Sequence, residues 1–407
     1  MSQLNALIEE HCTNGVEYKG LGEVGTFVRG SGLQKKDFVD EGIGCIHYGQ
    51  VYTDYGISAT QPKSFVTAEF ASNKRKVLPG DVFIATTSEN DEDLGKAVAW
   101  LGNDALVASG DAYIYKHSLD AKYVAYFLNS TSFHEQKQRW ITGTKVRRIA
   151  ASALERIIIP VPPLPVQQEI VRKLDMFTQL EAELEAELEA RKKQYSYYAG
   201  GLLEPKDGDR KFFLGQISKI VRGASPRPIR SFVTEDPTGT PWIKIGDVPD
   251  EGKYVTQTNQ RINDDGVKKS RLIKPGDFIL SNSMSFGRPY ISKITGCIHD
   301  GWLSISQFEE TLIPDYLYYL LRSNPVQAQF SQRAGSSTVR NLNADIVKAV
   351  VVSVPSLEEQ RRIVEILNNF DSLTNDLYSG LPAEIAARRK QYEYYRDKLL
   401  TFKELSA

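Results

Sequence analysis

The segment Leu164–Leu203, LPVQQEIVRKLDMFTQLEAELEAELEARKKQYSYYAGGLL, decides the fold. Its apolar residues recur in steps of three and four that average about 3.5, which is the period of a coiled-coil seam. Glu, Lys, Arg and Gln fill most of the positions between them and favour a helix. At about 1.5 Å per residue, the segment predicts a helical rod of roughly 55 Å. The predicted seam comprises Ile170, Leu174, Phe177, Leu180, Leu184, Leu188, Tyr195, Tyr198 and Leu202.

A second segment of the same kind runs from Leu357 to Leu400 and predicts a second rod. Each rod has a single apolar stripe, so we expect the two stripes to be buried against each other. The second rod also contains Ser379-Gly380-Leu381-Pro382, where glycine and proline predict a kink. Its predicted seam comprises Ile363, Leu367, Phe370, Leu373, Leu377, Leu381, Ile385, Tyr392, Tyr395 and Leu399.

The bulk composition predicts an ordinary protein of two or three domains. The chain has 407 residues, of which 41% are hydrophobic and 25% charged. No apolar run reaches the roughly 18 residues of a membrane helix, and the N-terminus does not read as a signal peptide. Three widely spaced cysteines predict neither disulfides nor zinc, which fits a reducing cytoplasm. The net charge of −1 neither supports nor excludes DNA binding, because glutamates gathered in the first rod account for part of it.

The chain contains an internal repeat of about 193 residues. Phe27-Val28-Arg29-Gly30 returns as Ile220-Val221-Arg222-Gly223, and Val161-Pro162 returns as Val354-Pro355. Two copies at so long a period indicate a duplicated domain rather than a solenoid. Further pairs are Pro79-Gly80-Asp81 with Pro275-Gly276-Asp277, residues 123–128 with 316–321, Val146-Arg147 with Val339-Arg340, and RKKQYSYY (191–198) with RRKQYEYY (388–395).

Each copy predicts the same order of elements, and the fold class expected is α+β. A first strand and a Gly-rich loop precede a β-rich region, in which Pro-Gly-Asp turns introduce the strands. A helix, a last apolar strand ending in proline, and the long helix follow. The expected bounds are strands 25–28 and 217–221, helices 120–130 and 314–323, and strands 156–161 and 349–354; a helix is also expected from Leu4 to His11, and a capping box at Ser356–Glu359.

No catalytic centre, cofactor site or metal site is expected. Val161-Pro162-Pro163-Leu164 lacks the polar first residue and the aromatic of the aminomethyltransferase tetrapeptide, and no P-loop or dinucleotide loop is present. Pro249-Asp250-Glu251-Gly252-Lys253 resembles a fragment of a nuclease metal motif, but its acidic residues are crowded into one loop, which favours a surface turn. The five histidines form no ligand pair.

Polar and basic loops recur at equivalent places in both copies. They cover residues 31–36, 86–90 and 143–148 in the first copy and residues 224–230, 281–288 and 335–341 in the second. Their residue types bond phosphates and base edges, although solvated loops without function remain the alternative for any one residue. The candidate DNA-binding residues are Lys35, Lys36, Ser88, Lys145 and Arg147 in the first copy, and Arg227, Arg230, Asn282, Arg288, Ser336 and Arg340 in the second.

The whole chain resembles the DNA-specificity subunit of type I restriction-modification systems. The resemblance rests on Trp242–Asp247 (WIKIGD), on Val354–Val364 (VPSLEEQRRIV) as the junction that follows a recognition domain, and on the order and duplication of these motifs. The tandem Glu-Ala-Glu-Leu units of Glu181–Leu188 are similar to the subgroup with tetrapeptide repeats in the central helix. One departure is Ala199-Gly200-Gly201, where the second rod has Arg396-Asp397-Lys398, and it predicts fraying of the first rod.

The resemblance implies two target-recognition domains held about a pseudo-twofold axis by two antiparallel helices, each reading half of a split sequence. It implies double-stranded DNA and two adenine-methyltransferase subunits as partners, leaves a restriction subunit open, and implies a chain that is not itself an enzyme. The expected domains are an N-terminal helix (1–15), recognition domains 16–161 and 204–354, and conserved helices 162–203 and 355–401. A non-catalytic protein-binding scaffold with duplicated domains on a coiled-coil spacer is the alternative.

Overall fold

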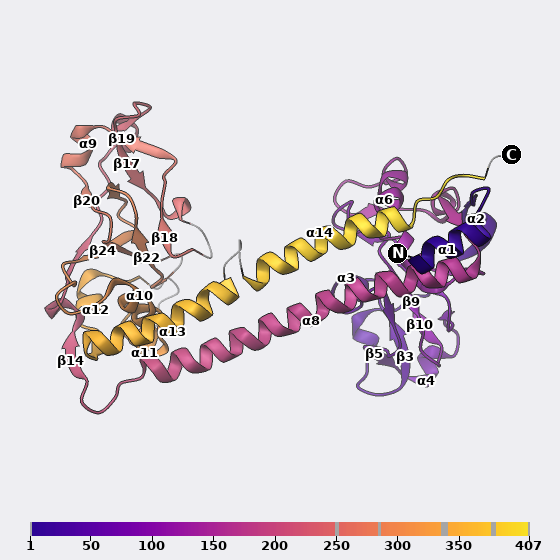
Figure 1. The fold of residues 1–407 in the computed structure, drawn as a ribbon, viewed down its shortest axis with the longest axis horizontal. Coiled ribbons are helices and arrows are strands. Elements are labelled where there is room, and N and C mark those ends of the chain that lie inside the picture. The colour runs from indigo at the N-terminus through magenta and orange to yellow at the C-terminus, as the bar shows by residue number, and fades with distance from the viewer. Residues whose placement is uncertain (1, 249–251, 284–285, 335–340, 376–379, 406–407) are drawn as a thin grey trace. The chain divides into compact units, whose positions relative to one another are not determined.

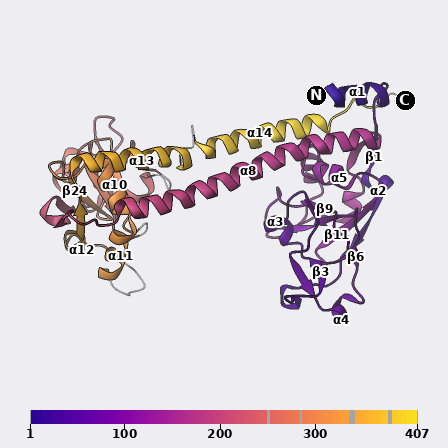
Figure 2. The same cartoon turned by 60° about the horizontal axis from the view of Figure 1, so that its bottom comes forward.

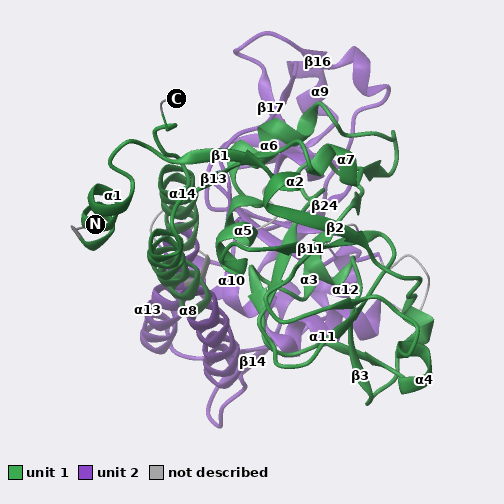
Figure 3. Ribbon diagram, turned by 90° about the vertical axis from the view of Figure 1, so that its right-hand side faces the viewer, with its two compact units in different colours: residues 1–183, 385–407 green, residues 184–384 purple. Residues whose placement is uncertain are grey.

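A computed structural model of the chain describes residues 2–248, 252–283, 286–334, 341–375 and 380–405 (Figure 1). The chain divides into two compact units, which Figure 3 shows in separate colours. Unit 1 comprises Met1–Glu183 and Ile385–Ala407, and unit 2 comprises Leu184–Glu384. Each unit therefore contains one copy of the repeat, and unit 1 also takes in the C-terminal end of the chain.

Unit 1 is built on a five-stranded sheet and a four-stranded sheet. The five-stranded sheet has the order β2-β11-β7-β9-β4 and is antiparallel except at its β4 edge. The four-stranded sheet has the order β5-β3-β10-β6. The strands are β2 Gly25–Arg29, β3 Ile43–Ile46, β4 Ser58–Ala59, β5 Ser64–Val66, β6 Lys76–Val77, β7 Val82–Ala85, β9 Ala97–Trp100, β10 Leu106–Ala108 and β11 Ala112–His117.

Unit 2 repeats this topology. Its first sheet has the order β15-β24-β21-β22-β18, with the same strand directions as the five-stranded sheet of unit 1. Its second sheet, β16-β19-β17-β23-β20, again has a parallel pair at its centre, β17 with β23. The duplication predicted from the sequence is thus confirmed, although the second sheet of unit 2 has one strand more than that of unit 1, β16 at its edge. The strands are β15 Lys219–Arg222, β16 Val233–Thr234, β17 Thr240–Ile243, β18 Tyr254–Val255, β19 Gln260–Ile262, β20 Arg271–Ile273, β21 Phe278–Ser281, β22 Pro289–Ser292, β23 Gly296–Ile298 and β24 Trp302–Ser306.

A two-stranded ladder closes each unit beside the long helices. In unit 1, β1 (Glu17–Gly20) pairs with β13 (Ile158–Val161), and in unit 2, β14 (Arg210–Phe213) pairs with β25 (Val351–Val354). The last strands are shorter at their starts than the sequence predicted, because short helices α7 (Ala151–Leu154) and α12 (Ala344–Lys348) come just before them. The remaining short elements are α2 Leu21–Val24, η1 Lys35–Asp37, α3 Gln50–Thr53, α4 Ala68–Ala71, β8 Thr87–Ser88, β12 Arg147–Arg148, η2 Leu214–Gln216, η3 Ile229–Ser231, η4 Ile245–Asp247 and α9 Asp264–Lys268.

The helix predicted after the sheets is present in both copies, but it is followed by another that the sequence analysis missed. α5 (Ala121–Phe127) and α10 (Pro314–Arg322) end slightly earlier than expected, and α6 (Thr131–Gln138) and α11 (Asn324–Arg333) follow them. Both missed helices are mainly polar, so their periodicity is weak. Each is fixed by one glutamine side chain that accepts from one backbone N–H and donates to the carbonyl of the same residue: Gln136 bonds Ile158, and Gln329 bonds Val351.

The first long helix has the predicted bounds. α8 runs from Leu164 to Leu203 without interruption, so the fraying predicted at Ala199-Gly200-Gly201 is wrong. The second rod is divided into α13 (Leu357–Asn375) and α14 (Leu381–Leu399), which agrees with an interruption near Pro382; Ser379 and Leu377 lie outside the described residues. The capping box is half formed, because the Ser356 hydroxyl accepts from the Glu359 N–H, whereas the Glu359 carboxylate bonds Arg362 and Lys206.

The helices pack antiparallel within each unit. In unit 1, Phe177 of α8 stacks on Tyr395 of α14, with ring centroids 5.4 Å apart, and Glu181 pairs with Arg389 at 2.5 Å. In unit 2, Tyr198 of α8 stacks on Phe370 of α13 at 5.7 Å. The start of each long helix instead belongs to a domain core. Ile170 and Leu174 pack into the core of unit 1, and Ile363 and Leu367 into that of unit 2, because α5 and α10 lie against these turns.

A buried glutamine attaches each long helix to its domain. The side chain of Gln167 accepts from the Asp120 N–H at 2.9 Å and donates to the Pro162 carbonyl at 2.7 Å. Gln360 makes the same pair of bonds with Ile313 and Pro355. Both glutamines are almost fully buried, so each fixes the angle at which the helix leaves the last strand.

The C-terminal tail that follows α14 is part of the fold of unit 1. The Val16 N–H donates to the Lys403 carbonyl at 2.9 Å, and the Leu405 N–H donates to the Val16 carbonyl at 3.0 Å. The Tyr18 hydroxyl bonds both backbone groups of Phe402. The helix expected from Leu4 to His11 is α1 (Ser2–His11), and Figure 2 shows it near the C-terminal tail.

Candidate nucleic-acid interface

The repeated Arg-Gly motif positions a loop in each unit. The Arg29 Nε donates to the Gly110 carbonyl at 3.0 Å, and the Arg222 Nε donates to the Asp300 carbonyl at 3.1 Å. The glycine that follows must be a glycine. A Cβ at Gly30 would lie 1.8 Å from the Ser109 carbonyl oxygen, and one at Gly223 would lie 2.2 Å from that of His299. The motif thus brings the loop after the first strand against residues 109–111 or 299–301.

Further backbone hydrogen bonds connect the second loop to residues 109–111 or 299–301. Others connect the residue that follows the third loop to the second loop. In unit 1, the Thr86 N–H donates to the Asp111 carbonyl, and the Ile149 N–H donates to the Thr86 carbonyl. In unit 2, the Asn282 N–H donates to the Gly301 carbonyl at 3.1 Å, and the Leu342 N–H donates to the Asn282 carbonyl at 2.8 Å. Three loops far apart in the sequence therefore meet in unit 1. In unit 2 the first two loops and Leu342 meet on an equivalent backbone frame, and residues 335–340 of the third loop lie outside the described residues.

Each loop cluster contains a further segment that the sequence analysis missed. Residues 109–111 and 299–301 lie at the centre of each loop cluster, yet they share no sequence motif, because the frame uses only their backbone. Their side chains differ: unit 1 has Gly110 where unit 2 has Asp300. Asp300 accepts from the Ser225 hydroxyl at 2.7 Å, and this bond, with His299 and Arg222 nearby, holds the pKa of its carboxyl below the usual value.

Among the first-copy candidates, the lysines are the most accessible. Lys35, Lys36 and Lys145 are exposed. Arg147 is half-buried, pairs with Asp91 at 2.8 Å and donates to the Gly143 carbonyl at 2.6 Å. Ser88 is only 8% exposed and lies opposite Arg147 in the β8–β12 pair. The structure thus brings Ser88 and Arg147 together and keeps Ser88 inside the loop cluster.

The second-copy candidates divide in the same way. The Arg227 side chain is 84% exposed, with its Nη2 at 3.7 Å from Asp300, and Arg230 is exposed in η3. Arg288 is half-buried over the ring of Tyr290. Asn282 is 4% exposed, and its amide donates to the Asp300 carbonyl, so it holds the loops in place. Ser336 and Arg340 lie outside the described residues.

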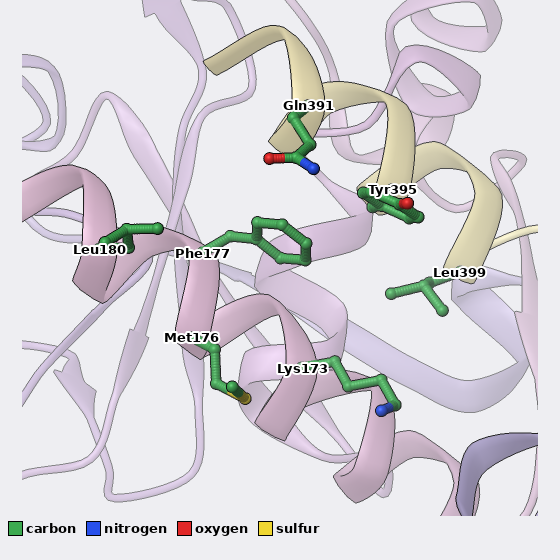
Figure 4. A pocket seen from close by; sticks show the side chains of 7 residues that line it. All are labelled: Lys173, Met176, Phe177, Leu180, Gln391, Tyr395 and Leu399. Carbon is green, nitrogen blue, oxygen red and sulfur yellow. The ribbon is translucent and has the colours of Figure 1, made fainter. Parts of the chain in front are cut away.

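Outside these loops, an apolar groove of about 360 Å³ lies between α8 and α14 in unit 1. Figure 4 shows Phe177 and Leu180 of α8 and Tyr395 and Leu399 of α14 lining it. The cation at its edge, Lys173, is paired with Glu169 at 3.4 Å. This groove is an incompletely filled part of the helix seam and does not gather acid–base groups as a catalytic pocket would.

Within the described residues, no helix combines the length and the apolar character that a membrane span requires. In the same residues, His, Cys, Asp and Glu side chains do not gather in groups of three or more that could hold a metal ion.

Comparison with known proteins gives matches along most of the chain. The family described as type I restriction modification DNA specificity domain matches residues 14–190 and again residues 206–387. The chain is 34% identical over 293 residues to the type I restriction enzyme EcoR124I/EcoR124II specificity subunit of Escherichia coli, covering 69% of this chain and 70% of that one. It is 32% identical over 316 residues to a putative type I restriction enzyme specificity subunit of Haemophilus influenzae, covering 74% and 76%.

Solved structures share the fold. A chain from a structure of the assembly and conformational transition of a type I R-M system aligns over 95% of this chain and 97% of its own length, with a TM-score of 0.67 and 19% identity. The HsdS subunit from Thermoanaerobacter tengcongensis aligns with a TM-score of 0.53 over 95% and 96%, at 17% identity. With two matched copies of the family's domain, the chain belongs to the family of type I restriction-modification specificity subunits.

Proposed function

We propose that this chain reads a bipartite DNA sequence within a cytoplasmic type I restriction-modification complex. In this proposal it is the non-catalytic subunit, and two modification subunits that methylate adenine dock on it; whether a restriction subunit joins is left open. The observation that carries the proposal is the pair of loop clusters, built on one backbone frame and carrying different side chains. The family supports the assignment of these clusters to DNA.

A constant frame with variable side chains suits a reader of two unlike half-sites. Sequence is read by side chains at base edges, whereas phosphate contacts only position the protein. The loop after the first strand carries Lys35 and Lys36 in unit 1 and Arg227 and Arg230 in unit 2, and Gly110 corresponds to Asp300. Cations in this loop of both units supply phosphate contacts, and the residues that differ between the units supply different base preferences.

Salt-dependent DNA binding distinguishes the proposed function from that of a scaffold that binds only protein. A DNA reader binds short duplexes with an affinity that falls steeply as salt rises, because bound cations displace condensed counterions. Binding of the purified chain and of its complex to duplexes, measured between 50 and 200 mM salt at spacings of about 50 mM, is the test. Affinity that does not change with salt would favour the scaffold. Methyl transfer by the purified chain without a partner would contradict the non-catalytic role.

Alanine at an exposed loop cation is expected to weaken DNA binding. For Arg227→Ala, loss of a base contact would cost about 1–3 kcal/mol and relax one position of the target, whereas loss of a phosphate contact would reduce the salt slope by about one. Lys211→Ala is the matched control, since Lys211 is an exposed cation of the same unit on β14, outside the loops. Unchanged affinity and methylated sequence after alanine at most exposed candidates would refute the loop assignment.

An inserted Glu-Ala-Glu-Leu unit in α8 is expected to lengthen the unread spacer of the DNA target by one or two base pairs. One unit adds about 6 Å of helix, and DNA rises about 3.4 Å per base pair. Four residues exceed one helical turn by about 40°, so the apolar stripe keeps its face, whereas an insertion of two residues turns it away and serves as the damaging control. The methylated sequence, mapped in host DNA, reports the spacer. An unchanged spacer with an active complex would contradict this expectation.

A further inference from the structure

An arginine stands at the same place in both units, at the end of the strand that leads into the first loop. Arg29 ends β2 and Arg222 ends β15, and both side chains are exposed. Each donates from Nε to a backbone carbonyl of the loop cluster. In the described part of the chain, the Nη groups of both arginines have no hydrogen-bond partner. The carbonyl bond therefore anchors each guanidinium at the cluster and leaves its Nη–H donors for a ligand.

A second arginine recurs beside the second sheet of each unit. Arg75 and Arg271 both lie four residues before the proline of the Pro-Gly-Asp turn, and both are exposed. The Arg75 carbonyl accepts from the Ala108 N–H, and Arg271 pairs with Ile298. Ala108 and Ile298 are equivalent, because the carbonyl of each accepts from the residue after the repeated Arg-Gly motif. The units thus share two arginines at matched places of the backbone frame.

A serine hydroxyl joins the two arginine-bearing segments in each unit. In unit 1, the Ser31 hydroxyl accepts from the Arg75 N–H at 2.7 Å, and the Arg75 Nη1 donates to the Arg29 carbonyl at 2.7 Å. In unit 2, the Ser270 hydroxyl donates to the Ala224 carbonyl at 2.7 Å. The serine comes from opposite segments in the two units, yet it connects the same segments. The two arginines of each unit are therefore held close together.

The neighbours of these arginines differ between the units, whereas the arginines do not. Lys76 follows Arg75, and its counterpart after Arg271 is the exposed Leu272. Internal bonding does not account for the second arginine. Within the described residues, Arg271 makes no side-chain hydrogen bond, ion pair or ring contact, so the bond that Arg75 donates is not a reason for an arginine in unit 2.

We propose that these arginines, Arg29 with Arg75 and Arg222 with Arg271, bind phosphates of the DNA at each half-site without reading bases, a role that rests on the proposed function. Two unlike half-sites share the sugar–phosphate backbone and differ in their base edges, so groups that are the same in both readers suit the shared part. The planar, positively charged guanidinium matches a phosphate with two parallel N–H bonds. The pairs thereby set the register in which the differing loop side chains meet the bases.

Arg271 gives the cleanest test, because its side chain bonds nothing among the described residues. In the full-length chain, Arg271→Gln is expected to reduce the slope of log affinity against log salt by about 0.9, on duplexes with and without the target sequence. The fall in affinity between about 50 and 200 mM salt should become about 3.5-fold smaller. Arg271→Lys keeps the charge and should restore the slope. Lys211→Gln removes an exposed positive charge from β14, outside the loops, and is the matched control that should leave the slope unchanged.

Arg75→Gln and Arg75→Lys should repeat these two results in unit 1. None of these substitutions should change the methylated sequence, mapped in host DNA, because phosphate contacts carry no sequence information. A changed base in either half-site would overturn the phosphate role. An unchanged slope in both Gln variants, while the unsubstituted chain binds with a steep salt dependence, would overturn it and leave the proposed function standing. Binding of the unsubstituted chain that does not vary with salt would overturn both.

Discussion

Exchanging residues 16–161 for the equivalent region of another specificity subunit is expected to change one half of the methylated DNA sequence and to leave the other half unchanged. Both ends of the exchanged region lie in one two-stranded ladder, since Glu17 pairs with Val161. A segment bounded in this way brings its own sheet and all three loops of the first cluster. The bonds between Val16 and Lys403 use backbone groups, so they do not depend on the incoming side chains, whereas the bonds to Phe402 require a tyrosine at position 18.

The change in the methylated sequence should be large, because specific DNA binding exceeds non-specific DNA binding by about 10³-fold or more. The complex carrying the exchanged chain should therefore stop methylating the original target and methylate a hybrid one. Mapping methylated adenines in host DNA measures both halves together. The matched control exchanges residues 209–354, which should alter the opposite half. A change in both halves after a single exchange would show that the two clusters do not read independently.

Removal of residues 401–407 is expected to destabilise unit 1 strongly. The deletion removes the backbone bonds between Val16 and the tail, the bonds of the Tyr18 hydroxyl to Phe402, and the Phe402 side chain that packs on the core of unit 1. Hydrogen bonds contribute about 1 kcal/mol each, and a half-buried aromatic adds a similar or larger amount, so we expect a loss of about 3–5 kcal/mol. For a unit of this size, the melting temperature should fall by about 6–20 °C.

Thermal unfolding and amide exchange over residues 16–20 measure this loss. Glu404→Ala is the control, because Glu404 is exposed and takes part through its backbone, so the variant should melt like the unsubstituted chain. The melting temperature of Phe402→Ala should lie between those of the deletion and of Glu404→Ala. A deletion variant with an unchanged melting temperature would show that the tail does not unfold cooperatively with unit 1.

In unit 2, the segment that corresponds to the tail lies inside the chain and connects two elements. In unit 1 the tail is a terminal segment, so its own residues do not indicate that it has a structural role. Gly208 follows α8 in unit 2 with a φ of +97°, and Gly15 has a φ of +111° where the tail meets the N-terminal segment. Both positions need the left-handed conformation that favours glycine. In unit 2, residues 203–210 make this junction as one continuous chain. In unit 1, the same junction is made by hydrogen bonds between the two separate ends of the chain.

The sequence by itself determined the duplication, the order of elements and the bounds of α8, because these depend on local periodicity, turn residues and repeated motifs. It also predicted the polar loops, of which the three of the first copy and the first two of the second meet in the described residues. The tertiary structure decided which loop residues are accessible: Lys35 and Arg227 are exposed, whereas Ser88 and Asn282 are buried. Burial depends on contacts with segments such as residues 109–111 and 299–301, which contribute backbone rather than a recognisable motif.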